Sequence, residues 1–74
     1  MRTLYDLNIG EDGDVKAILS IGTMRRRLFE IGLISGTNVS CILKGCGESM
    51  SAFMVRGALI AIRKEDAQNV ILLE

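Results

Sequence analysis

The 74-residue sequence contains no histidine, and this absence excludes several kinds of catalytic site. A Ser–His or Cys–His pair cannot be assembled without an imidazole to act as the base. A glycine-rich phosphate loop is also missing, because Gly45-Cys46-Gly47 is too short and no helix is expected after it. The chain is too short to enclose a typical ligand pocket together with a core. The sequence therefore predicts a protein that is not an enzyme.

Aromatic residues are scarce and net charge is absent, and both features argue against a nucleic-acid partner. Aromatic side chains, on which RNA-binding proteins stack bases, make up 4% of the sequence. The nine basic and nine acidic residues cancel, whereas nucleic-acid affinity depends on releasing phosphate counterions with lysine and arginine. The charge is nevertheless uneven, since residues 15–64 contain eight basic and two acidic residues. One basic surface between acidic ends is therefore expected.

Long hydrophobic runs are also absent. No apolar segment approaches the roughly 20 residues that span a bilayer. The acidic start, from Met1 to Asp14, lacks the apolar region of a signal peptide. We therefore expect a cytoplasmic protein that contacts a membrane only through a partner.

The two cysteines, Cys41 and Cys46, are too few for a disulfide framework, and in the cytosol they are expected to be reduced. Their spacing is not that of a Cys-x-x-Cys pair, so they could bind a metal only with carboxylates or a second chain. Glu11, Asp12 and Asp14 lack the spacing of a calcium loop and fit a solvated acidic turn. We expect one core cysteine, one loop cysteine and no cofactor. The alternative is an iron or other transition-metal site that uses Cys41 and Cys46, shared across a dimer.

Hydrophobic residues make up 49% of the sequence and form short patterned runs separated by glycine turns. In the run over residues 38–44, Val39, Cys41 and Leu43 share one face. Leu4, Leu7 and Ile9 are expected to anchor the N-terminal segment to the core. Strands are predicted over residues 15–20, with a bulge near Ile18, and over residues 38–44, 50–56, 58–63 and 70–73, with one helical turn over residues 64–69.

One helix is predicted over residues 23–32. Met24, Leu28 and Ile31 form a single apolar stripe at helical spacing. Thr23 is a suitable N-cap, and Gly32 is a suitable C′ residue. Short strands with one short helix after the first of them predict a mainly β fold, a small SH3-like antiparallel barrel in one domain over residues 1–74.

Two features of the sequence suggest a surface for a protein partner. Three successive arginines, Arg25 to Arg27, fit a solvated helix face, and they also fit a docking face because arginine is enriched at interface hot spots. The strand from Met50 carries apolar groups on both faces, so one set is either exposed for binding or packed as ordinary core. The candidate partner-binding residues are Arg25, Arg26, Cys46, Glu48, Met50 and Phe53.

In order and spacing, these features resemble the ferrous-iron transport protein A (FeoA) family from Leu4 to Leu72. Ser35 stands where the family usually has proline, and Glu48-Ser49-Met50 replaces a Gly-Asp-Pro type of turn. The most specific residues of the resemblance are Arg26-Arg27-Leu28, Ile31-Gly32-Leu33 and Gly36-Thr37, followed by Val55-Arg56-Gly57 and Ile60-Ala61-Ile62-Arg63.

The resemblance implies an accessory role in bacterial ferrous-iron uptake. Such proteins act on the cytosolic side of the permease FeoB, which carries a GTP-binding domain. We therefore expect a protein-interaction module whose partner is the cytosolic region of a FeoB-like permease, and a monomer or weak homo-oligomer. An orphan regulatory domain is a further alternative, because similar barrels are appended to iron-dependent repressors, although this chain has no helix-turn-helix.

Overall fold

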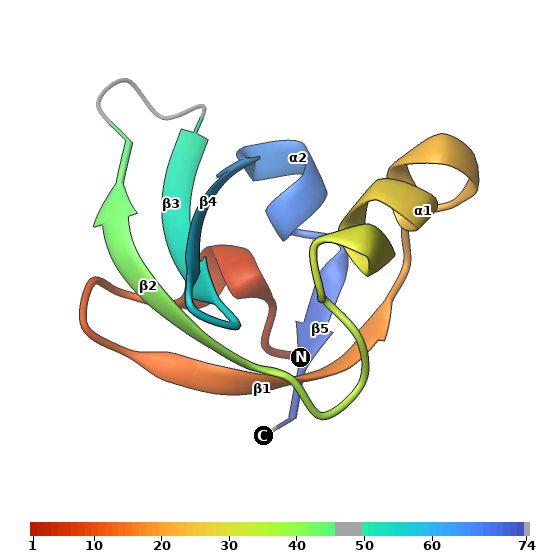
Figure 1. Ribbon diagram of the computed structural model, residues 1–74. Coiled ribbons are helices and arrows are strands. Elements are labelled where there is room, and N and C mark those ends of the chain that lie inside the picture. The colour runs from red at the N-terminus through yellow and green to blue at the C-terminus, as the bar shows by residue number, and fades with distance from the viewer. Residues whose placement is uncertain (46–49, 74) are drawn as a thin grey trace.

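The computed structural model describes residues 1–45 and 50–73 and contains one five-stranded antiparallel sheet in the order β4-β3-β2-β1-β5 (Figure 1). The predicted mainly β architecture, with a short helix after the first strand, is confirmed. The strands are β1 Asp12–Ile18, β2 Asn38–Lys44, β3 Met50–Val55, β4 Ala58–Arg63 and β5 Val70–Leu72. The helices are the 3-10 helix η1 Leu4–Asp6, α1 Gly22–Glu30 and α2 Lys64–Ala67.

Strand β1 is shared between the two halves of the sheet. Its residues 12–14 pair with β2, and its residues 15–18 pair with β5. The register shifts between Val15 and Ala17, so the bulge lies at Lys16 and not near Ile18 as predicted. A bulge adds one residue to one strand and bends it, which lets β1 curve from one half of the sheet to the other (Figure 1).

A second bulge changes which residues of β2 face the core. Val39 and Cys41 are fully buried, as predicted, but the register against β3 shifts between Cys41 and Leu43. The extra residue, Ile42, reverses the alternation that follows it. The prediction that Leu43 shares the inner face is therefore wrong, and its side chain is 58% exposed.

The core lies between the curved sheet and the N-terminal segment. Leu4 and Leu7 are fully buried, as predicted, whereas Ile9 lies on the exposed turn before β1. Phe53 is the largest fully buried side chain. The buried hydrophobic cluster consists of Leu4, Leu7, Val15, Ile18, Leu28, Leu33, Val39, Cys41, Phe53, Val55, Ile62, Ala67, Val70 and Leu72.

Helix α1 begins one residue earlier than predicted, and Thr23 is not its N-cap. The N-cap is Ile21, and Gly22 enters the helix with a φ of +62°. The predicted C-terminus is confirmed. Gly32 has a φ of +103°, and the Leu33 N–H donates to the Leu28 carbonyl at 3.0 Å, the arrangement of a Schellman motif. The apolar stripe is also confirmed, because Leu28 is buried and its neighbours Met24 and Ile31 pack against the core.

The end of α1 is held against the β3–β4 hairpin. Arg56 and Gly57, with φ of +51° and +84°, form the two-residue turn of this hairpin, a conformation typical of type I′ turns. The Arg56 side chain lies directly over Gly32, where a Cβ would come within 2.5 Å of Arg56 Cδ. Gly32 is therefore required twice, for its backbone conformation and for this close approach.

Candidate protein-docking surface around helix α1

Within residues 1–45 and 50–73, no three His, Cys, Asp or Glu side chains are grouped so that they could hold a metal ion. Cys41 is fully buried, and burial raises the pKa of its thiol while the positive charge of Lys44 opposes that rise. Cys46 and Glu48, two of the candidate residues, lie outside the described residues. No helix in the described part of the chain is long and apolar enough to cross a bilayer.

The acidic residues at the start of β1 contact an amide side chain. Asn38 Nδ2 donates to Asp12 Oδ2 and to Asp14 Oδ1, both at 3.0 Å. A donor therefore occupies the position between the two carboxylates where a cation would have to bind. This arrangement fastens β1 to β2.

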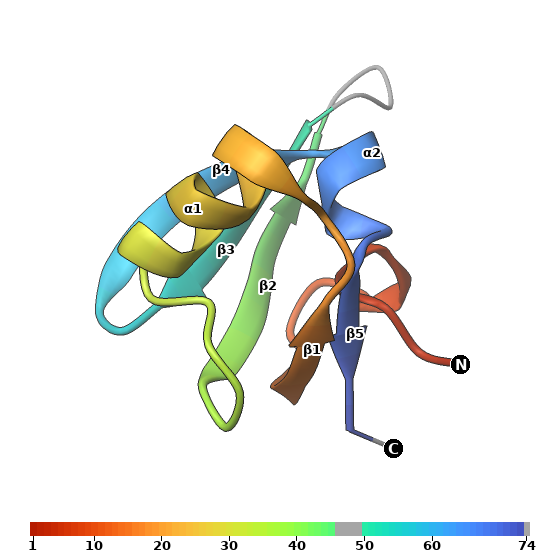
Figure 2. The same cartoon turned by 90° about the vertical axis from the view of Figure 1, so that its right-hand side faces the viewer.

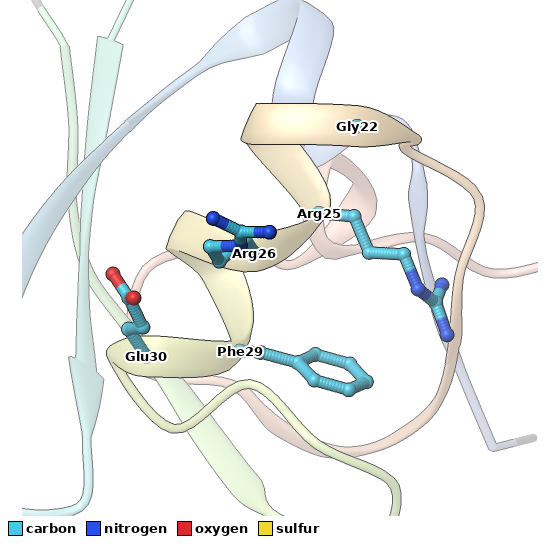
Figure 3. Close-up of a pocket in the computed structure, with 5 residues that line it drawn as sticks. All are labelled: Gly22, Arg25, Arg26, Phe29 and Glu30. Carbon is cyan, nitrogen blue, oxygen red and sulfur yellow. The ribbon is translucent and has the colours of Figure 1, made fainter.

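The outward face of α1 carries a shallow hollow of about 440 Å³ lined by Gly22, Arg25, Arg26, Phe29 and Glu30 (Figure 3). The side chains fall into two pairs, each one helical turn apart. Arg25 and Phe29 extend to one side of the helix and Glu30 extends to the other, while Arg26 lies in front of the helix between them (Figure 3). The spacing of four residues places each pair on the same face.

Arg25 is held in place at two points. Its Nη1 donates to the Ile18 carbonyl at 2.8 Å, and its guanidinium carbon lies 4.8 Å from the centre of the Phe29 ring. A cation over an aromatic face at this distance is attracted by the ring quadrupole. The pair therefore presents a positioned charge next to an aromatic ring that is 45% exposed. Arginine and aromatic side chains are the residues enriched at interface hot spots.

Arg26 is exposed, and within the described residues its guanidinium has no hydrogen-bond or ion-pair partner. Its charge is thus available to a partner. Sequence reasoning missed Phe29, which lies four residues after Arg25 and outside the apolar stripe of the helix. That spacing was the signal that could have identified it as an exposed aromatic.

The two candidates from β3 have different positions. Phe53 is 1% exposed and pairs with Cys41 and Ile60 on the inner face of the sheet, so the prediction that it contacts a partner is wrong. Met50 is partly exposed and lines a second hollow, between α1 and β4. The structure therefore does not bring Met50 together with Arg25 and Arg26. They lie in hollows on two sides of α1.

The sequence model of the FeoA domain matches residues 2–73 of the chain. Comparison with curated protein sequences gives no match. Among solved structures, the FeoA protein of Chlorobium tepidum superposes with a TM-score of 0.90 at 21% identity, covering 96% of this chain and 68% of that one.

Two further solved structures extend the comparison. FeoA of Stenotrophomonas maltophilia, complexed with zinc, gives a TM-score of 0.86 at 25% identity and covers 97% of this chain and 89% of its own. It is described as an SH3-domain protein and a candidate activating factor for ferrous-iron transport, so the SH3-like fold is confirmed. A manganese-dependent transcriptional repressor gives 0.87 at 19% identity, covering 97% of this chain and 40% of the repressor.

Proposed function

Because the chain belongs to the FeoA domain family, we propose that it is a non-catalytic accessory protein of bacterial ferrous-iron uptake. It acts as a protein-interaction module on the cytosolic part of the FeoB permease. The observation that carries this proposal is the face of α1, where a positioned Arg25 and an exposed Phe29 lie beside the exposed charge of Arg26.

This face supports docking by ordinary physical means. Arg25 already forms its internal contacts, so little side-chain entropy is lost when its remaining donors meet a carboxylate of the partner. Arg26 contributes a solvated charge that accelerates association and is screened by salt. Phe29 contributes apolar area at a low entropic cost because an aromatic side chain has few rotatable bonds.

The proposal does not require a resident cofactor. The alternative was a metal site built from Cys41 and Cys46. Cys41 Sγ belongs to a side chain that is fully buried beside Phe53, and its raised thiol pKa disfavours the thiolate that a metal needs. Cys41 would have to leave the core to act as a ligand, which supports the interaction module over the thiol site.

The test is a titration of the protein into the purified cytosolic region of the permease from the same organism. Three conditions are compared, with a GTP analogue, with GDP and without nucleotide. Saturable binding in at least one condition is expected. A folded domain that binds in none of them would contradict the proposal, and dependence on nucleotide would identify the state that the domain recognises.

Arg26→Glu is the variant that tests the α1 face directly. We expect affinity for the permease region to fall roughly tenfold, because an attractive charge becomes a repulsive one. The thermal melt should be unchanged because the side chain is exposed. The matched control is Lys16→Glu, the same charge change on an exposed residue of β1. Equal affinity of the two variants would remove the α1 face from the interface.

A further inference from the structure

The five-stranded sheet has two end strands, and within the described residues only one of them is covered. The edge of β5 is covered by the N-terminal segment, because the Leu72 N–H donates to the Arg2 carbonyl at 2.8 Å and Thr3 forms a β-bridge with Ile71. Strand β4 has no such neighbour in the described part of the chain, because its only ladder is with β3. An uncovered edge is a template for another strand.

The hydrogen bonds of β2 show which way the backbone of each strand points. The Cys41 N–H donates to the Glu11 carbonyl, and the Cys41 carbonyl accepts from the Gly10 N–H, both at 2.9 Å. The polar groups of Cys41 therefore point toward the β1 side. Successive residues of a strand alternate, so Ser40 points its polar groups toward β3 and its partner Met54.

The same alternation continues across the hairpin to β4. The backbone N–H and C=O of Met54 point toward β2. Those of the next residue, Val55, therefore point toward β4, where its partner is Ala58. Counting on from Ala58, the N–H groups of Leu59, Ala61 and Arg63 and the C=O groups of Leu59 and Ala61 point away from β3. The Arg63 C=O belongs to the N-cap of α2 and accepts the first bond of that helix. These three residues present a row of backbone donors and acceptors along the outer edge of the sheet.

A groove lies along this edge. It has a volume of about 400 Å³ and runs between β4 and α1, which lies alongside that strand (Figure 2). Met24 and Ile31 line it from the helix, and Ile60 and Ile62 line it from β4. Its base is therefore apolar, and its open side is bordered by exposed polar backbone.

We propose that an extended segment of the permease binds in this groove and pairs with the outer edge of β4 as a sixth strand. The inference rests on the proposed function and identifies how the partner is recognised. Side chains on one face of the added strand would pack on the apolar base of the groove, while its backbone would bond to Leu59, Ala61 and Arg63.

Charge and shape select the chemistry of this segment. The groove is lined by two positive side chains, Arg27 and Arg63, and one negative side chain, Asp66. An extended segment with alternate apolar residues and a carboxylate therefore complements it. Residues of α1 line one side of the groove and residues of β4 line the other, so the occupant has to fit between the helix and the edge of the strand.

Amide hydrogen exchange of the wild-type protein tests the proposal without any substitution. On addition of the cytosolic region of the permease, exchange at Leu59, Ala61 and Arg63 is expected to slow at least tenfold. Ile60 and Ile62 already bond to β3, so their exchange should change much less. This alternating pattern is specific to strand addition, since contact through side chains alone would not produce it.

A proline substitution provides the second test. Ala61→Pro removes one outward N–H and no bond of the β3–β4 ladder, a position where a strand tolerates proline. We expect it to weaken permease binding at least tenfold more than the matched Ala61→Thr, which also changes the side chain but keeps the N–H. Circular dichroism and the thermal melt check that both variants fold.

The outcomes separate the two proposals. If the wild-type protein binds the permease region but Leu59, Ala61 and Arg63 gain no protection, strand addition is wrong and the proposed function stands. If it binds in no nucleotide state, both are wrong. Protection that appears in the protein alone, together with a dimer in sedimentation, would identify a second copy as the occupant and overturn the inference, as would a bound segment that is helical.

Discussion

Strands β4 and β5 are the two end strands of the same sheet, but they differ in burial and in what covers their outer edges. All three residues of β5 are buried, and Arg2 and Thr3 cover its outer edge. Strand β4 is twice as long, with six residues, and its Leu59 is 60% exposed. One end of the sheet is thus part of the core, while the other is a surface.

The difference shows how a very small domain can tolerate an interaction edge. An exposed, apolar edge strand is a liability because it can pair with other chains. Here the N-terminal segment covers one edge, and α1 stands beside the other without bonding to it. A partner segment can then pair with β4 only if it fits between that strand and α1. This requirement limits which proteins can bind at the edge.

Removing the anchor of the covered edge should have the largest effect. Leu4 is fully buried and holds η1 against the core next to β5. Leu4→Ala should lower the free energy of unfolding by about 2–5 kcal/mol, because a buried leucine loses its apolar contacts and leaves a cavity. Urea unfolding measures the loss, and amide exchange at Ile71 and Leu72 should accelerate with it.

The matched control for this variant is the same substitution on the other edge. Leu59→Ala removes an exposed leucine from β4 and should change stability by no more than about 0.5 kcal/mol. If both variants were equally destabilised, β4 would be as much a part of the core as β5, and the contrast between the edges would fail.

The position of α1 beside the open edge depends on Gly32, whose substitution should have an intermediate effect. Gly32→Ala should cost about 1–2 kcal/mol for the left-handed backbone alone. It should also displace Arg56, whose Cδ would lie 2.5 Å from the new Cβ. The predicted result is a lower thermal melting temperature and a change in the amide signals of the β3–β4 turn.

Two comparisons separate the backbone effect from the contact. Gly36 has a similar φ of +92°, and a Cβ added there would have no atom within 4 Å, so Gly36→Ala should show the backbone cost alone. In an Arg56→Ala background, the excess cost of Gly32→Ala over Gly36→Ala should disappear. An unchanged excess would mean that Arg56 does not position the end of the helix.

Much of the fold could be predicted from local signals. Strands β2 and β4 begin and end where alternation and flanking glycines indicated, and Gly32 ends α1 as expected. The bulges at Lys16 and Ile42 could not be placed, because a bulge depends on how two distant strands meet. For the same reason, Leu43 was assigned to the wrong face.

The candidate surface was harder to predict than the fold. A period of two separates Phe53 from Met54 but does not say which of them faces the core, so Phe53 was proposed as a contact although it is buried. The exposure of Arg25 and Arg26 followed from the helical stripe, and their contact with a partner stays a prediction. Strand β4 has an open edge because it is an end strand of the sheet. The order of the strands is a property of the whole fold and cannot be predicted from a local sequence pattern.

The smallest expected effect concerns the buried thiol of Cys41 at the centre of the sheet. It tests whether the centre of the sheet is closed to solvent while the β4 edge is exposed. Cys41 lies on β2, bonded through its backbone toward β1 and paired with Phe53 on β3. Burial raises the pKa of its thiol above the ordinary value of 9.0. The folded protein therefore keeps this proton to a higher pH than the unfolded chain does.

The sign of the resulting pH dependence follows directly. The contribution of this thiol to stability is fully present below pH 9.0 and decreases as the pH rises above that value toward the folded pKa. In a Cys46→Ser background, urea unfolding at pH 8 and at pH 10 should show a larger loss of stability for the Cys41 protein than for Cys41→Val. Because the two proteins differ only at residue 41, the pH-dependent contributions that they share cancel in the comparison.

The rate at which Cys41 is alkylated in the Cys46→Ser protein at pH 8 is a second test of the burial of this thiol. Iodoacetamide should modify folded Cys41 at least roughly 100-fold more slowly than the unfolded chain, because the reagent must wait for the core to open. Rapid modification of the folded protein would mean that the thiol reaches solvent without unfolding. In that case the core of the sheet would be as open as its β4 edge, and a metal site using Cys41 would again compete with the interaction module.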